Sequence, residues 1–157
     1  MTLYAASVPV FRHYVSQIAA MSVRGQASLD ARIGDSFPAG QQFATAAGFV
    51  LRVCCPLTGR TVPELPAPLG LRLMAVQAVL ASLTPADFVG AAERQFTHQA
   101  GQAQLTQTGA DFLHLYGLPN FFFHLTMGYA ALRVAGVGLG KADFDGLHAY
   151  PPGFRFG

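Results

Sequence analysis

Apolar side chains recur at steps of three and four residues near the start of the chain. Such spacing places side chains on one stripe of an amphipathic helix, and this stripe comprises Tyr4, Val8, Phe11, Val15 and Ile18. Pro9 suits a first turn, where the amide donors have no helical partner. We therefore expect the helix to begin effectively near Ser7, with Ser7 as its cap. The polar stretch between Gly25 and Asp35 then predicts a loop.

Two further stripes predict helices in the middle of the chain. The first runs from about Pro38 to Cys55 and is ended by Pro56 and Gly59. The second begins at Leu69. The apolar faces comprise Phe43, Ala47, Val50 and Cys54 in one helix and Leu69, Leu73, Val76, Leu80 and Leu83 in the other.

The segments around these helices carry turn signals. Residues 60–68 contain three prolines, and we expect an extended connection because the residue before a proline avoids the helical region. After the third helix, Thr84 and Pro85 resemble the cap and first position of a short turn that reaches Phe88.

The pattern changes to alternation between Arg94 and Thr108, which predicts a β-hairpin. We expect antiparallel pairing of residues near Arg94–His98 with residues near Gln104–Thr108. An isolated hairpin is marginally stable in water, so this one is expected to lie across the helices.

The last helical region opens at Gly109. It is expected to break or kink at residues 117–119 and to resume as far as about Ala135, with Gly136 as its C-cap. The sequence therefore predicts a mainly α protein, a four-helix bundle with a small β-hairpin before the last helix. With 157 residues the chain fits one domain, residues 1–145, followed by a loosely ordered tail, residues 146–157.

Hydrophobic residues make up 52% of the chain and charged residues 11%, and the mean hydropathy is +0.35. Typical domains carry about 25% charged residues, so part of the apolar surface is expected to be covered. The most apolar run, Phe121 to Leu139, contains Thr126 and Arg133 and does not suit a membrane span. The last helix is apolar on most of its circumference, and we therefore expect a homodimer with a largely apolar helix-on-helix interface.

The remaining composition argues against other partners. A net charge of +2 without clusters of Lys and Arg gives no footprint for nucleic acid or for anionic lipid. The first residues lack a basic stretch ahead of an apolar core, so we expect no signal peptide there. Cys54 and Cys55 are adjacent and do not suit a disulfide framework, which favours a cytoplasmic location.

Three segments resemble a known family. These are LYAASVPVF near the start, SLTPADFVGAAER before the hairpin and LPNFFFHLTMGYAALRVAGVGLGKADF at the end. Together they resemble the bacterial domain-of-unknown-function family 1993, of the DinB/YfiT-like superfamily of metalloenzymes, over residues 3 to about 145. The resemblance implies a four-helix bundle, frequent dimerisation and, in many members, a divalent metal held by three histidines. Some metal-bearing relatives transfer thiols or hydrolyse small molecules.

The pattern that the resemblance implies places one histidine on the second helix and two, a turn apart, on the last. The second helix of this chain has no histidine, and Gln41 and Gln42 are the nearest polar candidates. On the last helix His124 stands at such a position, with Asn120 one turn earlier. Amide carbonyls are weak ligands for zinc or nickel, so we expect neither the three-histidine metal site nor a cofactor.

His124 is the most informative candidate. At about 100° per residue, it lies nearly opposite Arg133 on the helix and is expected to face the bundle interior. It could be a ligand or general base in a pocket, or a neutral core histidine with satisfied nitrogens. The pocket candidates are Asn120, Phe121, His124 and Met127, and a small apolar ligand could lie among Phe121, Phe123 and Met127.

Other groups favour structural roles. His13 lies opposite the first apolar stripe and is expected at the surface, and Asp111 is expected to cap a helix. Cys54 and Cys55 are expected to be buried, inert thiols. The GxGxG string that ends at Gly140 has no strand before it and no clear helix after it, so it predicts a turn rather than a phosphate site.

Two functions remain open. The first is a noncatalytic or small-ligand-binding homodimer. The alternative is a divergent metal-dependent enzyme of the thiol transferase or hydrolase class that uses His124. No other catalytic residue is indicated.

Overall fold

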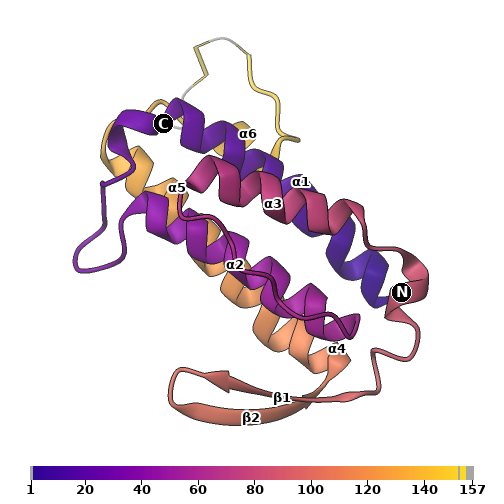
Figure 1. Cartoon of the computed structure of the whole chain (residues 1–157). Coiled ribbons are helices and arrows are strands. Elements are labelled where there is room, and N and C mark those ends of the chain that lie inside the picture. The colour runs from indigo at the N-terminus through magenta and orange to yellow at the C-terminus, as the bar shows by residue number, and fades with distance from the viewer. Residues whose placement is uncertain (1, 152, 155–157) are drawn as a thin grey trace.

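The computed structural model describes residues 2–151, 153 and 154. The helices α1 (Leu3–Arg24), α2 (Ala39–Leu57), α3 (Leu69–Ala81) and α5 (Leu118–Val134) lie side by side, and a hairpin crosses one end (Figure 1). This arrangement confirms the predicted mainly α bundle. The shorter elements are η1 (Gln26–Ser28), η2 (Pro85–Phe88), α4 (Gly109–Asp111), η3 (Phe112–Gly117) and α6 (Lys141–Asp145), with strands β1 (Gln95–Ala100) and β2 (Ala103–Thr108).

The core lies where the apolar stripes of the helices meet. Phe11 of α1, Phe43 of α2 and Phe121 of α5 are each 0% exposed. The rings of Phe11 and Phe121 lie edge to face, with centroids 5.0 Å apart. No helix among the described residues is long and apolar enough to cross a membrane.

The first helix begins earlier than the sequence predicts. Thr2, not Ser7, is its N-cap, and the Thr2 hydroxyl accepts a hydrogen bond from the amide of Ala5. Ser7 is buried inside the helix and donates to the carbonyl of Leu3 at 2.6 Å. Pro9 therefore stands in the helix interior. The helix tolerates it because Pro9 and Ala5 are both exposed, so water can reach the Ala5 carbonyl that loses its partner.

The second helix passes through Pro56 and ends at Leu57, whereas the sequence places its end before Pro56. Thr58 satisfies the last turn, since its amide and its hydroxyl both bond to the carbonyls of Cys54 and Cys55. The short turn η2 follows the prediction: Thr84 precedes it, and both the amide and the hydroxyl of Thr84 bond to Asp87.

The hairpin prediction is confirmed. Strands β1 and β2 pair antiparallel, with Gln95 opposite Thr108 and His98 opposite Leu105. Gly101, with φ of +60°, begins the two-residue turn between them, a conformation that glycine adopts at little cost. The ring of Phe96 stacks on Phe112 with centroids 5.6 Å apart, which fastens the hairpin to the bundle.

Of the predicted break or kink at residues 117–119, the break does not occur. The chain forms a π-helix, η3, and continues directly into α5, because the amide of Leu118 bonds to the carbonyl of Leu113 and the widened turn takes up an extra residue. A β-carbon on Gly117 would lie 2.6 Å from the Val53 side chain. This close approach to α2 requires glycine.

A helix follows the glycine string, although the sequence predicts only a turn there. Helix α6 packs on α1, where Asp143 forms an ion pair with Arg24. Consequently His13 is half-buried rather than at the surface, and its Nε2 lies 2.6 Å from the carbonyl oxygen of Asp145. The periodicity of α1 could not reveal this docking. Of the predicted tail, residues 152 and 155–157 lie outside the described residues.

Candidate functional site

His124 and Gln42 join the two most extensively packed helices, α5 and α2. Nδ1 of His124 lies 2.7 Å from Oε1 of Gln42, and Gln42 is only 2% exposed. An amide oxygen only accepts, so the proton of the neutral ring is on Nδ1 and Nε2 is left with a lone pair. No hydrogen bond to Nε2 is found among the described residues.

A pocket of about 220 Å³ opens beside this pair. It is lined by Asp35, Ser36, Phe37, Gln42, Phe123 and His124. The loop before α2 supplies one wall, and α2 and α5 supply the others. The loop residues were not candidates in the sequence, because loop residues carry no periodicity that indicates which way they face.

The four pocket candidates from the sequence have different positions. His124 is half-buried and lines the pocket, so it faces the cleft rather than the deep interior. Phe121 is 0% exposed and packs against Phe11 in the core, so it is not available to a ligand. Met127 is half-buried and does not line the pocket. Asn120 does not line the pocket either, and its side chain donates to the carbonyl of Tyr116 at 2.7 Å.

The ring of Phe49 forms the centre of an extended polar and aromatic cluster. His124 stacks on it at 5.6 Å and Tyr116 lies against it at 5.7 Å. The Arg52 guanidinium lies 4.5 Å from its centroid and donates to the Tyr116 hydroxyl at 3.1 Å. We call Gln42, Phe49, Arg52, Tyr116 and His124, together with the adjoining pocket, the α2–α5 site.

Arg52, Phe49 and Tyr116 were not candidates in the sequence. Phe49 and Arg52 follow Gln42 by seven and ten residues, so the three share one side of α2. This spacing was the signal in the sequence that could have identified Phe49 and Arg52. Tyr116 lies in the π-helix η3. Single π-helical turns are frequent at functional sites, but their position is not readable from periodicity.

The electrostatic environment keeps His124 neutral. Burial lowers the pKa of its imidazole below 6.5, and the positive charge of Arg52 lowers this pKa further. At neutral pH the ring is therefore a hydrogen-bond donor to Gln42 and an acceptor toward the pocket.

His98 approaches the same cluster from the hairpin. Its ring lies 4.3 Å from that of Tyr116 and 4.8 Å from that of Phe112. Nε2 bonds to Gln107 Oε1 at 2.8 Å, whereas Nδ1 is buried without a partner among the described residues. The hairpin thus supports Tyr116, and the Tyr116 hydroxyl in turn donates to the carbonyl of Gln99 at 3.4 Å.

The donor set does not fit the three-histidine metal site that the family resemblance implies. Where that pattern needs three imidazoles, α2 offers Gln42 and α5 offers Asn120 and His124. The Gln42 oxygen is bonded to His124 and the Asn120 amide to Tyr116. Within the described residues, no three His, Cys, Asp or Glu side chains gather closely enough to hold a metal ion.

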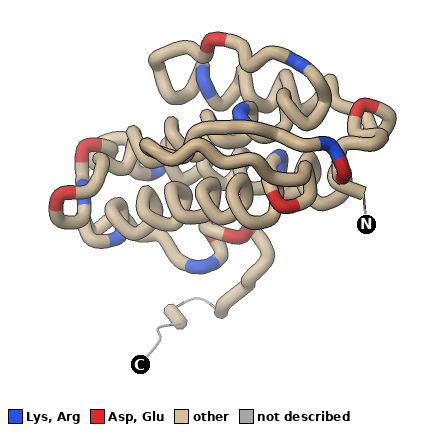
Figure 2. Tube along the Cα trace, turned by 90° about the horizontal axis from the view of Figure 1, so that it is seen from below, with Lys and Arg blue, Asp and Glu red and all other residues tan. Residues whose placement is uncertain are grey.

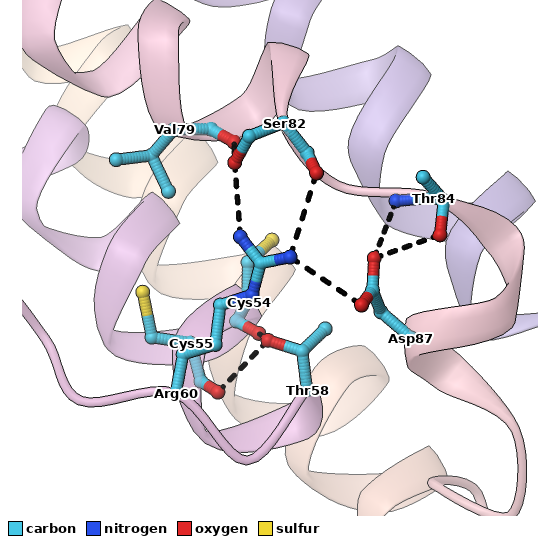
Figure 3. Close-up of polar contacts among 8 residues, drawn as sticks. All are labelled: Cys54, Cys55, Thr58, Arg60, Val79, Ser82, Thr84 and Asp87. Carbon is cyan, nitrogen blue, oxygen red and sulfur yellow. Dashed lines mark hydrogen bonds and ion pairs between the residues drawn. The ribbon is translucent and has the colours of Figure 1, made fainter.

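The two cysteines lie at the end of α2 and are 0% and 1% exposed. Burial raises the pKa of both thiols, and the charge of Arg60 only partly offsets this for Cys55. Figure 3 shows that the Arg60 guanidinium instead holds Ser82 at 2.9 Å and Asp87 at 3.3 Å. This cluster fastens the residue 60–68 connection to α3 and η2 and is structural.

Asp111 is not the helix cap that the sequence predicts. Thr108 is the N-cap of α4, and its hydroxyl accepts from the amide of Asp111 at 3.1 Å.

The charge distribution matches the sequence reading, since the Lys and Arg positions are scattered along the trace in Figure 2.

Comparisons with known proteins give the family. A family model described as "Domain of unknown function (DUF1993)" matches residues 3–145. Among solved structures, the chain is similar to a DinB family member protein from Shewanella denitrificans, with a TM-score of 0.83 and 28% identity over 95% of this chain and 94% of that chain. No curated protein matches the chain.

Proposed function

The chain belongs to the DUF1993 family and has a DinB-like fold, and on that premise we propose that it is a homodimeric protein that binds a small ligand at the α2–α5 site. The observation that carries the proposal is the position of His124. Its ring is fixed by Gln42 at 2.7 Å and borders a pocket of about 220 Å³. A fixed, neutral acceptor at the edge of an aromatic pocket suits a ligand that donates a hydrogen bond.

The pocket walls define the rest of the ligand. Phe37 and Phe123 are 48% and 57% exposed although both line the pocket. Exposed aromatic side chains that line a cleft favour a ligand with an apolar body. The volume suits a group about the size of one aromatic ring. We therefore propose a small ligand with an apolar body and a hydroxyl or similar donor for Nε2 of His124.

The test compares phenol with anisole, which keeps the ring but lacks the hydroxyl hydrogen. We expect phenol to shift the NMR signals of the His124 ring and the Gln42 side-chain amide, with millimolar affinity, and to bind at least about fivefold more tightly than anisole. Phe123→Ala should weaken phenol binding, whereas Val134→Ala, on the exposed end of the same helix, should not. Absence of phenol shifts at His124 would rule out this function.

We place the dimer interface on α1 and α3, although the sequence favoured the last helix. Helix α5 turns Phe121, Leu125 and Leu132 into the core, and its exposed apolar residues Phe123 and Val134 lie eleven positions apart rather than in one patch. By contrast, Val23 of α1 and Leu71 and Met74 of α3 are 74%, 55% and 68% exposed. The only charged side chain of α3, Arg72, donates to the carbonyl of Pro66 at 3.0 Å. A helix face that is apolar and free of like charge suits contact with a second copy.

We also propose a cytoplasmic location. Cys54 and Cys55 are both free and buried, as is usual for thiols in a reducing compartment. Fractionation of expressing bacteria should recover the protein with cytoplasmic markers, and recovery with periplasmic markers would contradict the proposal.

A further inference from the structure

Arg52 is held in place at the α2–α5 site by neutral groups. Its guanidinium lies over the Phe49 ring at 4.5 Å and donates to the Tyr116 hydroxyl at 3.1 Å. Both contacts leave its positive charge uncompensated. In the part of the chain that the structure describes, no acidic side chain forms an ion pair with Arg52, whereas Arg24 and Arg60 pair with Asp143 and Asp87.

Arg52 and His124 flank the same ring. Phe49 has the guanidinium of Arg52 at 4.5 Å and the imidazole of His124 at 5.6 Å from its centroid. At one end of the site the Arg52 guanidinium therefore offers positively charged N–H donors, and at the other end Nε2 of His124 offers a neutral acceptor. The Tyr116 hydroxyl, which accepts from Arg52, itself donates to the Gln99 carbonyl. The donors are fixed before any ligand arrives, which reduces the entropic cost of binding.

The charges at the α2–α5 site give the ligand a direction. Asp35 lines the pocket together with Gln42 and His124, whereas Arg52 lies outside the pocket lining. Gln42 and Arg52 are ten residues apart on α2, which corresponds to about 15 Å along the helix. A ligand with a negative group is repelled at the Asp35 end and attracted at the Arg52 end, so the negative group points toward Arg52.

We infer that the ligand of this site is a small carboxylate that also carries a hydroxyl group, with its carboxylate on the Arg52 guanidinium and its hydroxyl donating to Nε2 of His124. This inference rests on the proposed function above and adds the charge of the ligand. A guanidinium matches a carboxylate because both are planar and can form two parallel hydrogen bonds. A hydroxyl suits Nε2 because a second acceptor there would face the lone pair of the neutral ring.

The test uses 4-hydroxybenzoate and 4-hydroxybenzamide, which share the ring and the hydroxyl and differ in charge. NMR titration of the intact protein gives both affinities from the shifts of the His124 ring. We expect 4-hydroxybenzoate to bind about tenfold more tightly, and this preference to fall as salt is raised. Arg52→Gln should remove most of the preference, because it weakens the binding of 4-hydroxybenzoate far more than that of 4-hydroxybenzamide.

Arg12→Gln is the matched control, because Arg12 is an exposed arginine of α1, outside the α2–α5 site. This variant should keep the tenfold preference. Benzoate, which lacks the hydroxyl, should bind more weakly than 4-hydroxybenzoate to the wild-type protein. Equal binding of the two hydroxy probes, unaffected by Arg52→Gln, would overturn the inference and leave the proposed function standing. Absence of His124 shifts with every probe would overturn both.

Discussion

His124 shows how one neighbour and one cavity set the chemistry of a side chain. Gln42 fixes which ring nitrogen carries the proton, and burial together with Arg52 lowers the pKa of the imidazole. The ring therefore stays neutral where a free histidine begins to take up a proton.

Lowering the pH should expose this effect. Because the pKa of His124 is lower in the folded protein than in the unfolded chain, the unfolded chain binds more protons as the pH falls below about 6.5. The stabilising contribution is present above that pH and is lost as the pH falls through the folded pKa. We expect the free energy of unfolding to fall more between about pH 7.5 and pH 5 in the wild-type protein than in His124→Asn. Urea denaturation at several pH values measures it.

The two carboxyl groups whose pKa values are lowered, Asp87 and Asp145, do not obscure this window. The pKa of Asp87 is lowered by hydrogen bonds from Thr84, and that of Asp145 is lowered to about 2 by the amides of Leu147 and His148. The stability that these groups supply is present above 3.8, the ordinary pKa of the carboxyl, and is lost only at lower pH. Parallel wild-type and His124→Asn curves would contradict a lowered His124 pKa.

At the scale of residues, the sequence predicted part of the site. Helical spacing indicated that His124 faces inward, and the family resemblance pointed to Gln41 and Gln42 as the nearest polar candidates on the second helix. Of these two, Gln42 bonds to His124. The same helical spacing assigned Phe121 to the pocket, but Phe121 lies in the core. Helical spacing gives the direction of a side chain around its own helix, but it does not tell which other element lies in that direction. Two side chains that point in similar directions can therefore lie one in the core and the other in a cleft.

At the scale of elements, the α2–α5 pair depends on a close approach of the two helices. A β-carbon on Gly128 of α5 would lie 2.5 Å from the ring of Phe43, which is 0% exposed. A buried ring cannot move aside at little cost. The separation of the helices, and hence the His124–Gln42 distance, is set by this glycine.

Gly128→Ala tests this dependence. We expect it to destabilise the fold by about 1–3 kcal/mol through overpacking, in spite of the higher helix propensity of alanine. Gly48→Ala on α2 is the matched control, because nothing lies within 4 Å of its added β-carbon. That variant should gain up to about 1 kcal/mol. Thermal or urea denaturation of both variants measures the difference, and equal stabilisation by the two substitutions would show that α2 and α5 do not depend on close contact at Gly128.

Elements with a strong local pattern were predictable, and elements shaped by packing were not. The alternation of residues 94–108 is imperfect, and together with the family resemblance it predicted the hairpin, which the register confirms. The dipeptide Leu118-Pro119 argued for a helix break, yet η3 carries the chain through by bonding Leu118 to Leu113. Whether a proline ends a helix depends on the bonds available to the freed carbonyls, which the surrounding structure provides.

At the scale of the whole molecule, the uncovered apolar face lies between α1 and α3. A groove of about 440 Å³ runs there, lined by Val15, Ser16, Ala19, Ser22, Val23, Gly70, Leu73, Met74 and Gln77. Met74 lines this groove and is 68% exposed. A second copy that covers this face would bury the exposed apolar side chains of both copies.

Light scattering on charged variants tests the dimer. We expect the wild-type protein to be a dimer, with a stable interface of about 1,200–2,000 Å² in total. Met74→Glu places like charges across the interface and should yield monomers. Val134→Glu, at a position on α5 that is 74% exposed, should remain dimeric. If Val134→Glu dissociates the dimer and Met74→Glu does not, the interface lies on the last helix instead. If the wild-type protein is a monomer at all concentrations, the proposed dimer is wrong.

The sequence by itself determined the four long helices, the hairpin and the fold class. The spacing of apolar residues reports which side of each segment is buried, and this property is local to the segment. The family resemblance added the bundle topology. Even Pro9 and Pro56, which were expected at helix ends, lie in helices that the periodicity had identified.

Only the tertiary structure decided what meets at the site. Gln42 and His124 are 82 positions apart in the sequence, and Arg52, Tyr116 and the loop at Asp35 join them only because α2 packs along α5. Contacts of this kind depend on helix separation and on rotation about each helix axis. Small residues such as Gly117 and Gly128 set these quantities through close approach, and no single segment contains them. The chemistry of His124 is therefore a property of the packed bundle, since its protonation depends on side chains from another helix.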